Sequence, residues 1–193
     1  MPGNNQKYKA IVVGASAGGL YAISYIVEKL PQRYPLPIIV VQHRAKDQKD
    51  LLEEVLQSKS RIRIKQADEK ESIESNIVYI APPDYHLLIE KDETFSLSSD
   101  VPVHFSRPSI NVLFETAAKV FTNTLIGIIL TGASSDGAAG IVAVKNHGGL
   151  TIAQDPVEAQ FPFMPTASIE TKEVQHIWIL PEIQNFLLKI MDN

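Results

Sequence analysis

Length, composition and charge narrow the classes of protein to which this chain can belong. It has 193 residues, 45% of them hydrophobic, which predicts one domain over residues 1–193 with a polar tail at 1–8. Its 18 Lys and Arg against 22 Asp and Glu give a net charge of −4, which argues against nucleic acid as a partner. Cysteine is absent, which excludes disulfides and a cysteine nucleophile, and the apolar runs are too short for membrane insertion. We therefore expect a cytoplasmic monomer.

Apolar runs and helical patterns alternate along the chain. We predict strands at 9–14, 37–42, 77–81, 125–131 and 149–154, with helices at 20–30, 49–57, 108–121, directly after 137, and at 181–191. Ser109 or Ser106 could cap the helix at 108–121. Segment 86–98 reads as an antiparallel hairpin. Most of the strands lack polar alternation, which is typical of a parallel sheet buried between helices. The order predicts a doubly wound, three-layer α/β/α domain with a mainly parallel sheet and one antiparallel hairpin.

Three loops at the carboxyl ends of predicted strands carry reactive side chains, and ligands bind at that edge of an open parallel sheet. Ser16 lies in a G-x-S-x-G turn between a strand and a helix, the context of a nucleophile elbow. His43 directly follows the second strand, and Asp136 lies in a glycine-rich turn after the strand at 125–131. Serine, histidine and aspartate are the types that nucleophilic acyl transfer requires, as nucleophile, base and orienting carboxylate.

Each of these residues also has a purely structural interpretation. Gly14 and Gly18 could serve close packing with Ser16 as a helix N-cap, His43 could be a hydrogen-bonded loop residue, and Asp136 could cap a turn or helix. The other histidines lack the same placement; we interpret three as structural and expect that one, His104, could flank the pocket, the set being His86, His104, His147 and His176.

Several segments together resemble the catalytic domain of the chemotaxis protein-glutamate methylesterases: VVGASAGG, IIVVQH, VYIAPPDYHLLIE, SRPSINVLF, ILTGASSDGAAG and IAQDPVEAQFPFMP. The resemblance implies that Ser16 is the nucleophile, His43 the base and Asp136 the residue that orients the base. It also implies a γ-glutamyl methyl ester on a chemoreceptor's cytoplasmic helix as substrate, with glutamate and methanol as products. Related enzymes deamidate glutamine as well. This chemistry requires no metal or organic cofactor.

The chain departs from the family pattern in two residues and in its expected domain content. Ala17 and Ala133 stand where the family usually has threonine and methionine, and both are candidates for the oxyanion hole or pocket. Typical members also carry an N-terminal receiver domain, so we expect a stand-alone, constitutively active catalytic domain, with a separate response regulator as a possible partner.

Two other functions stay open at this point. A nucleotide-binding dehydrogenase also has a glycine-rich turn between strand and helix, although G-x-x-x-G-G is not the dinucleotide pattern. A non-catalytic signalling module could keep the same fold and bind a receptor without hydrolysing anything.

Overall fold

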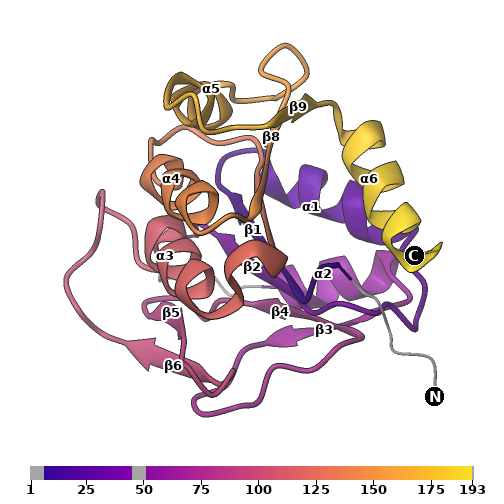
Figure 1. Ribbon diagram of the computed structural model, residues 1–193. Helices are drawn as coiled ribbons and strands as arrows, with labels where there is room; N and C mark the ends of the chain where they lie inside the picture. Colours follow the sequence, from indigo (N-terminus) through magenta and orange to yellow (C-terminus); the bar gives the residue numbers. More distant parts are fainter. Residues whose placement is uncertain (1–6, 45–50, 193) are drawn as a thin grey trace.

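The computed structural model describes residues 7–44 and 51–192, and these form a seven-stranded parallel sheet with helices on both faces (Figure 1). The sheet order is β3-β4-β2-β1-β7-β8-β9, and a separate antiparallel hairpin is made by β5 and β6. The strands are β1 Ala10–Ala15, β2 Ile38–Gln42, β3 Arg63–Gln66, β4 Ile77–Ile80, β5 His86–Ile89, β6 Phe95–Ser98, β7 Leu125–Ile129, β8 Leu150–Gln154 and β9 His176–Trp178. The helices are α1 Gly19–Glu28, α2 Leu52–Lys59, α3 Ile110–Phe121, α4 Ala138–Asn146, α5 Phe163–Glu170 and α6 Leu180–Lys189, with short 3₁₀ turns η1 Thr122–Thr124 and η2 Ile190–Asp192.

Two hydrophobic cores lie on opposite faces of the sheet. Helices α1, α2 and α6 pack over one face, and α3, α4, α5 and the β5–β6 hairpin cover the other. Strands β1, β2, β4 and β7 are buried along their whole length, because they lie in the middle of the sheet and are covered on both sides. This explains why their sequences are continuous apolar runs.

The predicted doubly wound α/β class with one hairpin is confirmed, and the five predicted strands are present with ends shifted by one or two residues. Elements β3, β9 and α5 were not predicted. Strands β3 and β9 are short edge strands with partly exposed side chains, so they lack a continuous apolar run. Helix α5 contains Pro165 and shows no clear apolar stripe. Most of the predicted tail and the first two residues of the helix predicted at 49–57 lie outside the described residues.

None of the helices in the described part of the chain has the length and apolar character that a membrane crossing requires.

Candidate active site

Strand register brings Ser16 and His43 to the same level at the carboxyl edge of the sheet. Strands β1 and β2 are parallel neighbours, with Ala15 paired to Gln42, so each candidate residue is the first one beyond the same pair. Backbone hydrogen bonds fix both residues to neighbouring strand ends. The His43 N–H donates to Ala15 O at 3.0 Å, and the Ser16 N–H donates to Thr131 O at 3.0 Å.

The site lies where the winding of the sheet reverses. From β1 the chain continues into α1 on one face, whereas from the adjacent β7 it continues into α4 on the opposite face. The loops after these two strands therefore diverge and leave a crevice at the sheet edge, which is the usual ligand position in this fold class. Ser16 follows β1, and Ala133 and Ser134 of the loop after β7 line the same hollow, whereas Asp136 of that loop is buried behind it.

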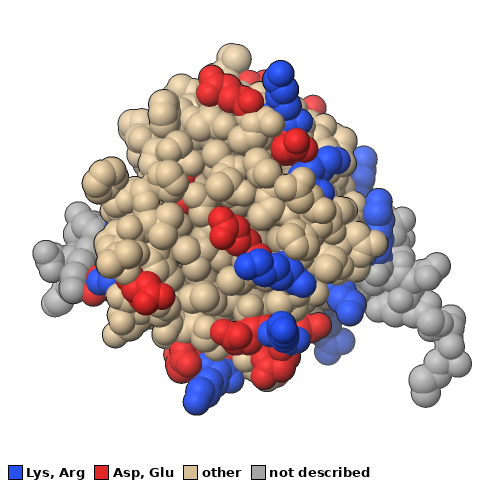
Figure 2. Space-filling view, turned by 60° about the vertical axis from the view of Figure 1, so that its left-hand side comes forward, with Lys and Arg blue, Asp and Glu red and all other residues tan. Residues whose placement is uncertain are grey.

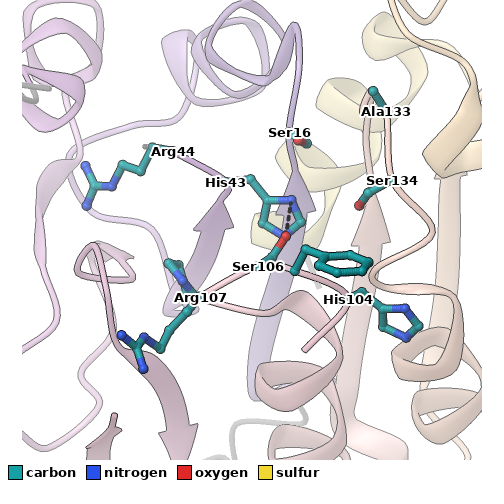
Figure 3. A pocket seen from close by; sticks show the side chains of 10 residues that line it. Ser16, His43, Arg44, His104, Ser106, Arg107, Ala133 and Ser134 are labelled. Carbon is teal, nitrogen blue, oxygen red and sulfur yellow. Dashed lines mark hydrogen bonds between the residues drawn. The ribbon is translucent and has the colours of Figure 1, made fainter. Parts of the chain in front are cut away.

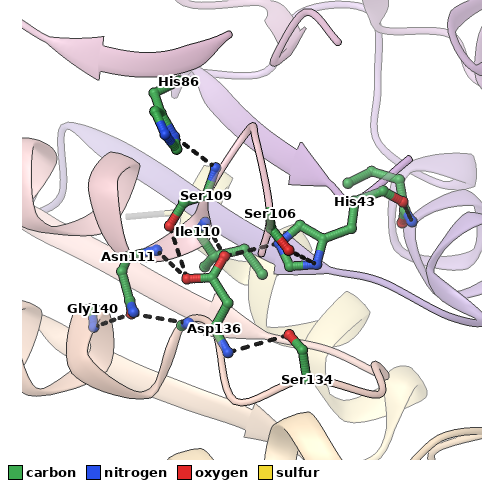
Figure 4. Close-up of polar contacts among 11 residues, drawn as sticks. His43, His86, Ser106, Ser109, Ile110, Asn111, Ser134, Asp136 and Gly140 are labelled. Carbon is green, nitrogen blue, oxygen red and sulfur yellow. Dashed lines mark hydrogen bonds and ion pairs between the residues drawn. The ribbon is translucent and has the colours of Figure 1, made fainter. Parts of the chain in front are cut away.

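Asp136 is completely buried and accepts four hydrogen bonds (Figure 4). Its Oδ2 lies 2.8 Å from His43 Nε2 and accepts the Ile110 N–H at 2.6 Å. Its Oδ1 accepts the Ser109 hydroxyl at 2.9 Å and the Asn111 N–H at 3.1 Å. Because an ionised carboxylate can only accept, the His43 proton lies on Nε2, which leaves Nδ1 as the basic nitrogen.

The same contacts keep Asp136 ionised. Burial by itself would raise the pKa of this carboxyl, but the hydrogen bonds from His43 and from the Ile110 and Asn111 N–H groups outweigh it and lower the pKa below its ordinary value. The N–H donors belong to the first turn of α3, where the helix dipole also favours a negative charge. Asp136 therefore caps α3 from another loop while it holds His43.

Ser109 occupies the N-cap position of α3, as one of the two sequence predictions had it, but its side chain does not cap the helix. Its hydroxyl bonds Asp136, and its N–H donates to His86 Nδ1 at 3.1 Å. Ser109, His86 and Asp136 thus form a second group of triad-type residues. Here the serine and aspartate are completely buried, the histidine is 2% exposed, and the hydroxyl bonds the carboxylate instead of the imidazole. We interpret this group as support for Asp136.

Gln42 is a residue of the site that was not predicted from the sequence. Its Nε2 donates to Ser16 O at 2.8 Å and to His43 O at 2.9 Å, so one buried amide joins the two loops. Its position directly before His43, at the end of a buried strand, is the sequence signal that could have identified it.

The glycines of the Ser16 turn serve close packing as well. A Cβ on Gly14 would lie 2.5 Å from Ile110 Cγ2, and a Cβ on Gly19 would lie 2.0 Å from Gln42 Oε1. Gly18, with φ 76°, is the N-cap of α1, so the interpretation of Ser16 as the N-cap is wrong.

Ser16 lies between two hollows at this edge. One, of about 540 Å³, is also lined by His43, Ser106 and Ala133 (Figure 3). The other, of about 560 Å³, is also lined by Ala17 and again by His43. The candidate pocket residues Ala133 and Ala17 thus each line one of the two hollows that Ser16 lines. Within the described ranges, no hydrogen bond joins Ser16 to His43. Instead, the His43 Nδ1 faces the Ser106 hydroxyl at 3.4 Å.

The remaining histidines lie apart from this contact between carboxylate and imidazole. His147 is the C-cap of α4 and its Nδ1 bonds Ala143 O, while His176 stacks on Trp178 in the edge strand β9. His104 lines the hollow that contains Ala133, in agreement with its expected place at the flank of the pocket.

A doubly wound parallel sheet with serine, histidine and a buried aspartate around its switch point is an arrangement typical of a hydrolytic enzyme of the α/β class. The chain belongs to the CheB methylesterase family, whose model matches residues 11–187.

Solved and curated relatives are similar over nearly the whole chain. The crystal structure of the Thermotoga maritima CheB methylesterase catalytic domain superposes with a TM-score of 0.90 at 31% identity, covering 95% of this chain and 98% of that one. A relative from Leptospira interrogans is 47% identical over 96% of each chain. A protein-glutamate methylesterase/protein-glutamine glutaminase of Carboxydothermus hydrogenoformans is 37% identical, and there this chain spans only 52% of the relative's length.

Proposed function

We propose that this chain, a carboxyl-ester hydrolase of the methylesterase family, hydrolyses γ-glutamyl methyl esters on chemoreceptor helices, with Ser16, His43 and Asp136 as its catalytic triad. The observation that carries the assignment of residues is the 2.8 Å contact between His43 Nε2 and Asp136 Oδ2 beside the hollow that Ser16 lines. In the other Ser-His-Asp group the serine is completely buried and its hydroxyl bonds the carboxylate, whereas Ser16 is partly exposed beside the hollow.

The proposed mechanism uses the two nitrogens of His43 differently. Asp136 holds the proton on Nε2, so Nδ1 accepts the proton of the Ser16 hydroxyl as its oxygen attacks the ester carbonyl. The resulting imidazolium, stabilised by the buried carboxylate, returns that proton to the departing methoxide, which leaves as methanol. Water then attacks the acyl-serine with Nδ1 again as base, which releases the glutamate and restores Ser16.

The proposed mechanism requires a hydrogen bond between the Ser16 hydroxyl and His43 Nδ1. Catalytic hydrogen bonds are often long without a ligand, so the missing Ser16–His43 bond does not argue against the pair. Ser106, which faces Nδ1 at 3.4 Å, is the competing partner that Ser16 must replace.

Backbone N–H groups are the natural donors to the oxyanion that forms on the ester oxygen. We propose those of Ala17 and Ala133, because each of these residues lines a hollow together with Ser16. Neither N–H donates a hydrogen bond to another residue of the described chain. Replacement of the family's threonine and methionine by alanine leaves both donors in place.

The same acyl-serine intermediate would also form from a glutamine side chain, with ammonia in place of methanol as the leaving group. Deamidation of receptor glutamines is therefore part of the proposal, as is a cytoplasmic location where the receptor helices are. On the face shown in Figure 2, acidic and basic side chains lie interspersed around a broad uncharged area, without a large field of one sign. This face offers no broad basic surface of the kind that nucleic acid requires.

The decisive experiment measures methanol release from a methylated receptor fragment and identifies the residue that carries the acyl group. The unmodified chain should release methanol, and a serine-reactive phosphonate should label Ser16 in peptide mass spectrometry. Ser16→Ala should lose both the methanol release and the labelling. Ser109→Ala is the matched control and should keep labelling at Ser16.

Two results would contradict the proposal. Labelling of Ser109, with Ser16→Ala still active, would move the chemistry to the buried group. A folded chain that binds the methylated fragment without any turnover would favour the non-catalytic module.

A further inference from the structure

A strained two-residue turn borders the hollow beside Ser16. Val103 and Ser106 pair as an antiparallel bridge, with N–H to O distances of 3.1 Å and 2.9 Å in the two directions. The residues between them, His104 and Phe105, have φ values of 47° and 62°. Two consecutive positive φ values are the requirement of a type I′ turn, where Asn-Gly is favoured and a bulky aromatic is strained.

This turn exposes the aromatic ring of Phe105 to solvent. Phe105 is 103% exposed, so its ring contributes no packing to either core. A single exposed apolar residue needs no explanation by itself. Here the exposure coincides with an unfavourable backbone and with a position on the wall of the reaction hollow. Strain of this kind persists where the surroundings enforce it and is concentrated at functional sites.

Contacts of the neighbouring residues Arg107 and Ser106 hold this turn in its strained conformation. Arg107 directly follows the turn, and its guanidinium donates to the Ser99 and Asp100 carbonyls at 2.7 and 2.9 Å. It also donates twice to Asp84 Oδ1, at 2.6 and 3.2 Å. On the inner side, Ser106 faces the imidazole of His43. The turn that carries Phe105 is therefore held between the Arg107 contacts and Ser106, which faces His43 Nδ1.

We propose that Phe105 is a substrate-docking residue, which contacts an aliphatic side chain of the substrate helix one turn from the ester. The inference rests on the proposed function, since an ester bonded to Ser16 brings its helix over this hollow. Helices are about 10–12 Å across, so a helix whose side chain reaches Ser16 also covers the wall of the hollow. Phe105 acts on the binding of the protein substrate and leaves the chemistry at Ser16 unchanged.

The test compares a protein ester with a small ester. Phe105→Ala should raise KM for the methylated receptor fragment by about ten-fold or more, as truncation of an aromatic contact residue does. For N-acetylglutamate γ-methyl ester, which is too short to reach the ring, kcat/KM should stay within about two-fold of the unmodified chain. Phe105→Leu, which keeps an apolar side chain, should recover most of the affinity for the fragment.

Two further variants separate docking from a general effect. Phe163→Ala removes another exposed phenylalanine, at the start of α5 and outside both hollows, and should leave KM unchanged. The double substitution His104→Asn with Phe105→Gly relieves the turn, so it should raise Tm by roughly 2–4 °C while it weakens fragment binding as Phe105→Ala does.

The outcomes distinguish this inference from the proposed function. An unchanged KM in Phe105→Ala, with turnover that still depends on Ser16, would overturn the docking role and leave the esterase intact. An equal rise of KM in Phe163→Ala would also overturn it, because the effect would then not belong to this turn. A chain that turns over neither ester would overturn the proposed function and this inference with it.

Discussion

Replacement of Asp136 by asparagine should damage stability and catalysis together. Each carboxylate oxygen accepts one backbone N–H, from Ile110 or Asn111, and one side-chain donor that can turn into an acceptor, so an amide nitrogen in place of either oxygen leaves one backbone N–H without an acceptor. An unsatisfied buried donor costs about 1–3 kcal/mol, and loss of the charge at the α3 N-terminus adds about 1 kcal/mol. The free energy of unfolding should therefore fall by about 2–4 kcal/mol, and Tm by roughly 5–15 °C.

Activity should fall more steeply than stability. If the new amide group faces His43, it donates to Nε2 and forces the ring proton onto Nδ1, the nitrogen that must accept the Ser16 proton. In serine proteases the wrong tautomer of the base lowers kcat by about 10⁴, so a loss of about 10³–10⁴ is expected here. The assay is methanol release, normalised to the fraction folded by circular dichroism, beside urea unfolding of the same samples.

Ser109→Ala is the matched control for this substitution. It removes one of the four hydrogen bonds but keeps the charge, so it should lose about 2 kcal/mol or less of stability and retain most of the activity. Equal losses of activity in Ser109→Ala and Asp136→Asn would refute the assignment of Ser109 to a supporting role. Asp136→Asn with unchanged kcat would refute the triad itself.

The remaining predictions concern stability at low pH, the pair of Ser16 and His43, and the Gln42 side chain that joins their two loops. Since the pKa of Asp136 in the folded chain lies below its ordinary value of 3.8, its stabilising contribution is complete above that value and is lost as pH falls through the folded pKa. Urea unfolding between about pH 5 and 2 should therefore show a steeper loss for the unmodified chain than for Asp136→Asn. Ser16→Ala and His43→Ala should each abolish most turnover, and the double variant should be little worse; strictly additive losses would contradict a shared step. Gly19→Ala should lower kcat, because the added methyl would displace Gln42 from the two carbonyls that it joins. Unchanged kinetics would show that these two hydrogen bonds of Gln42 are dispensable.

The sequence contained enough to predict the sheet and the three loops of the site. Strands such as β1 and β2 are apolar on both faces, which only a covered parallel sheet explains, and the residue after each strand end must lie at one edge. The reactive types of Ser16, His43 and Asp136 at those ends then predicted the chemistry, and the resemblance predicted the family. Elements stabilised mainly by neighbours, such as β9 and α5, left no such pattern.

Tertiary structure alone decided how these loops are joined. That Ala15 pairs with Gln42 depends on register, and two strands that are apolar on both faces carry no alternation from which their register could be predicted. The placement of Asp136 at the N-terminus of α3, 26 residues away from Ile110 in sequence, requires the complete fold. Local sequence specifies apolar periodicity and turns, because these depend on near neighbours. A buried carboxylate finds its donors only after distant segments have packed, and so its partners could not be predicted from the sequence.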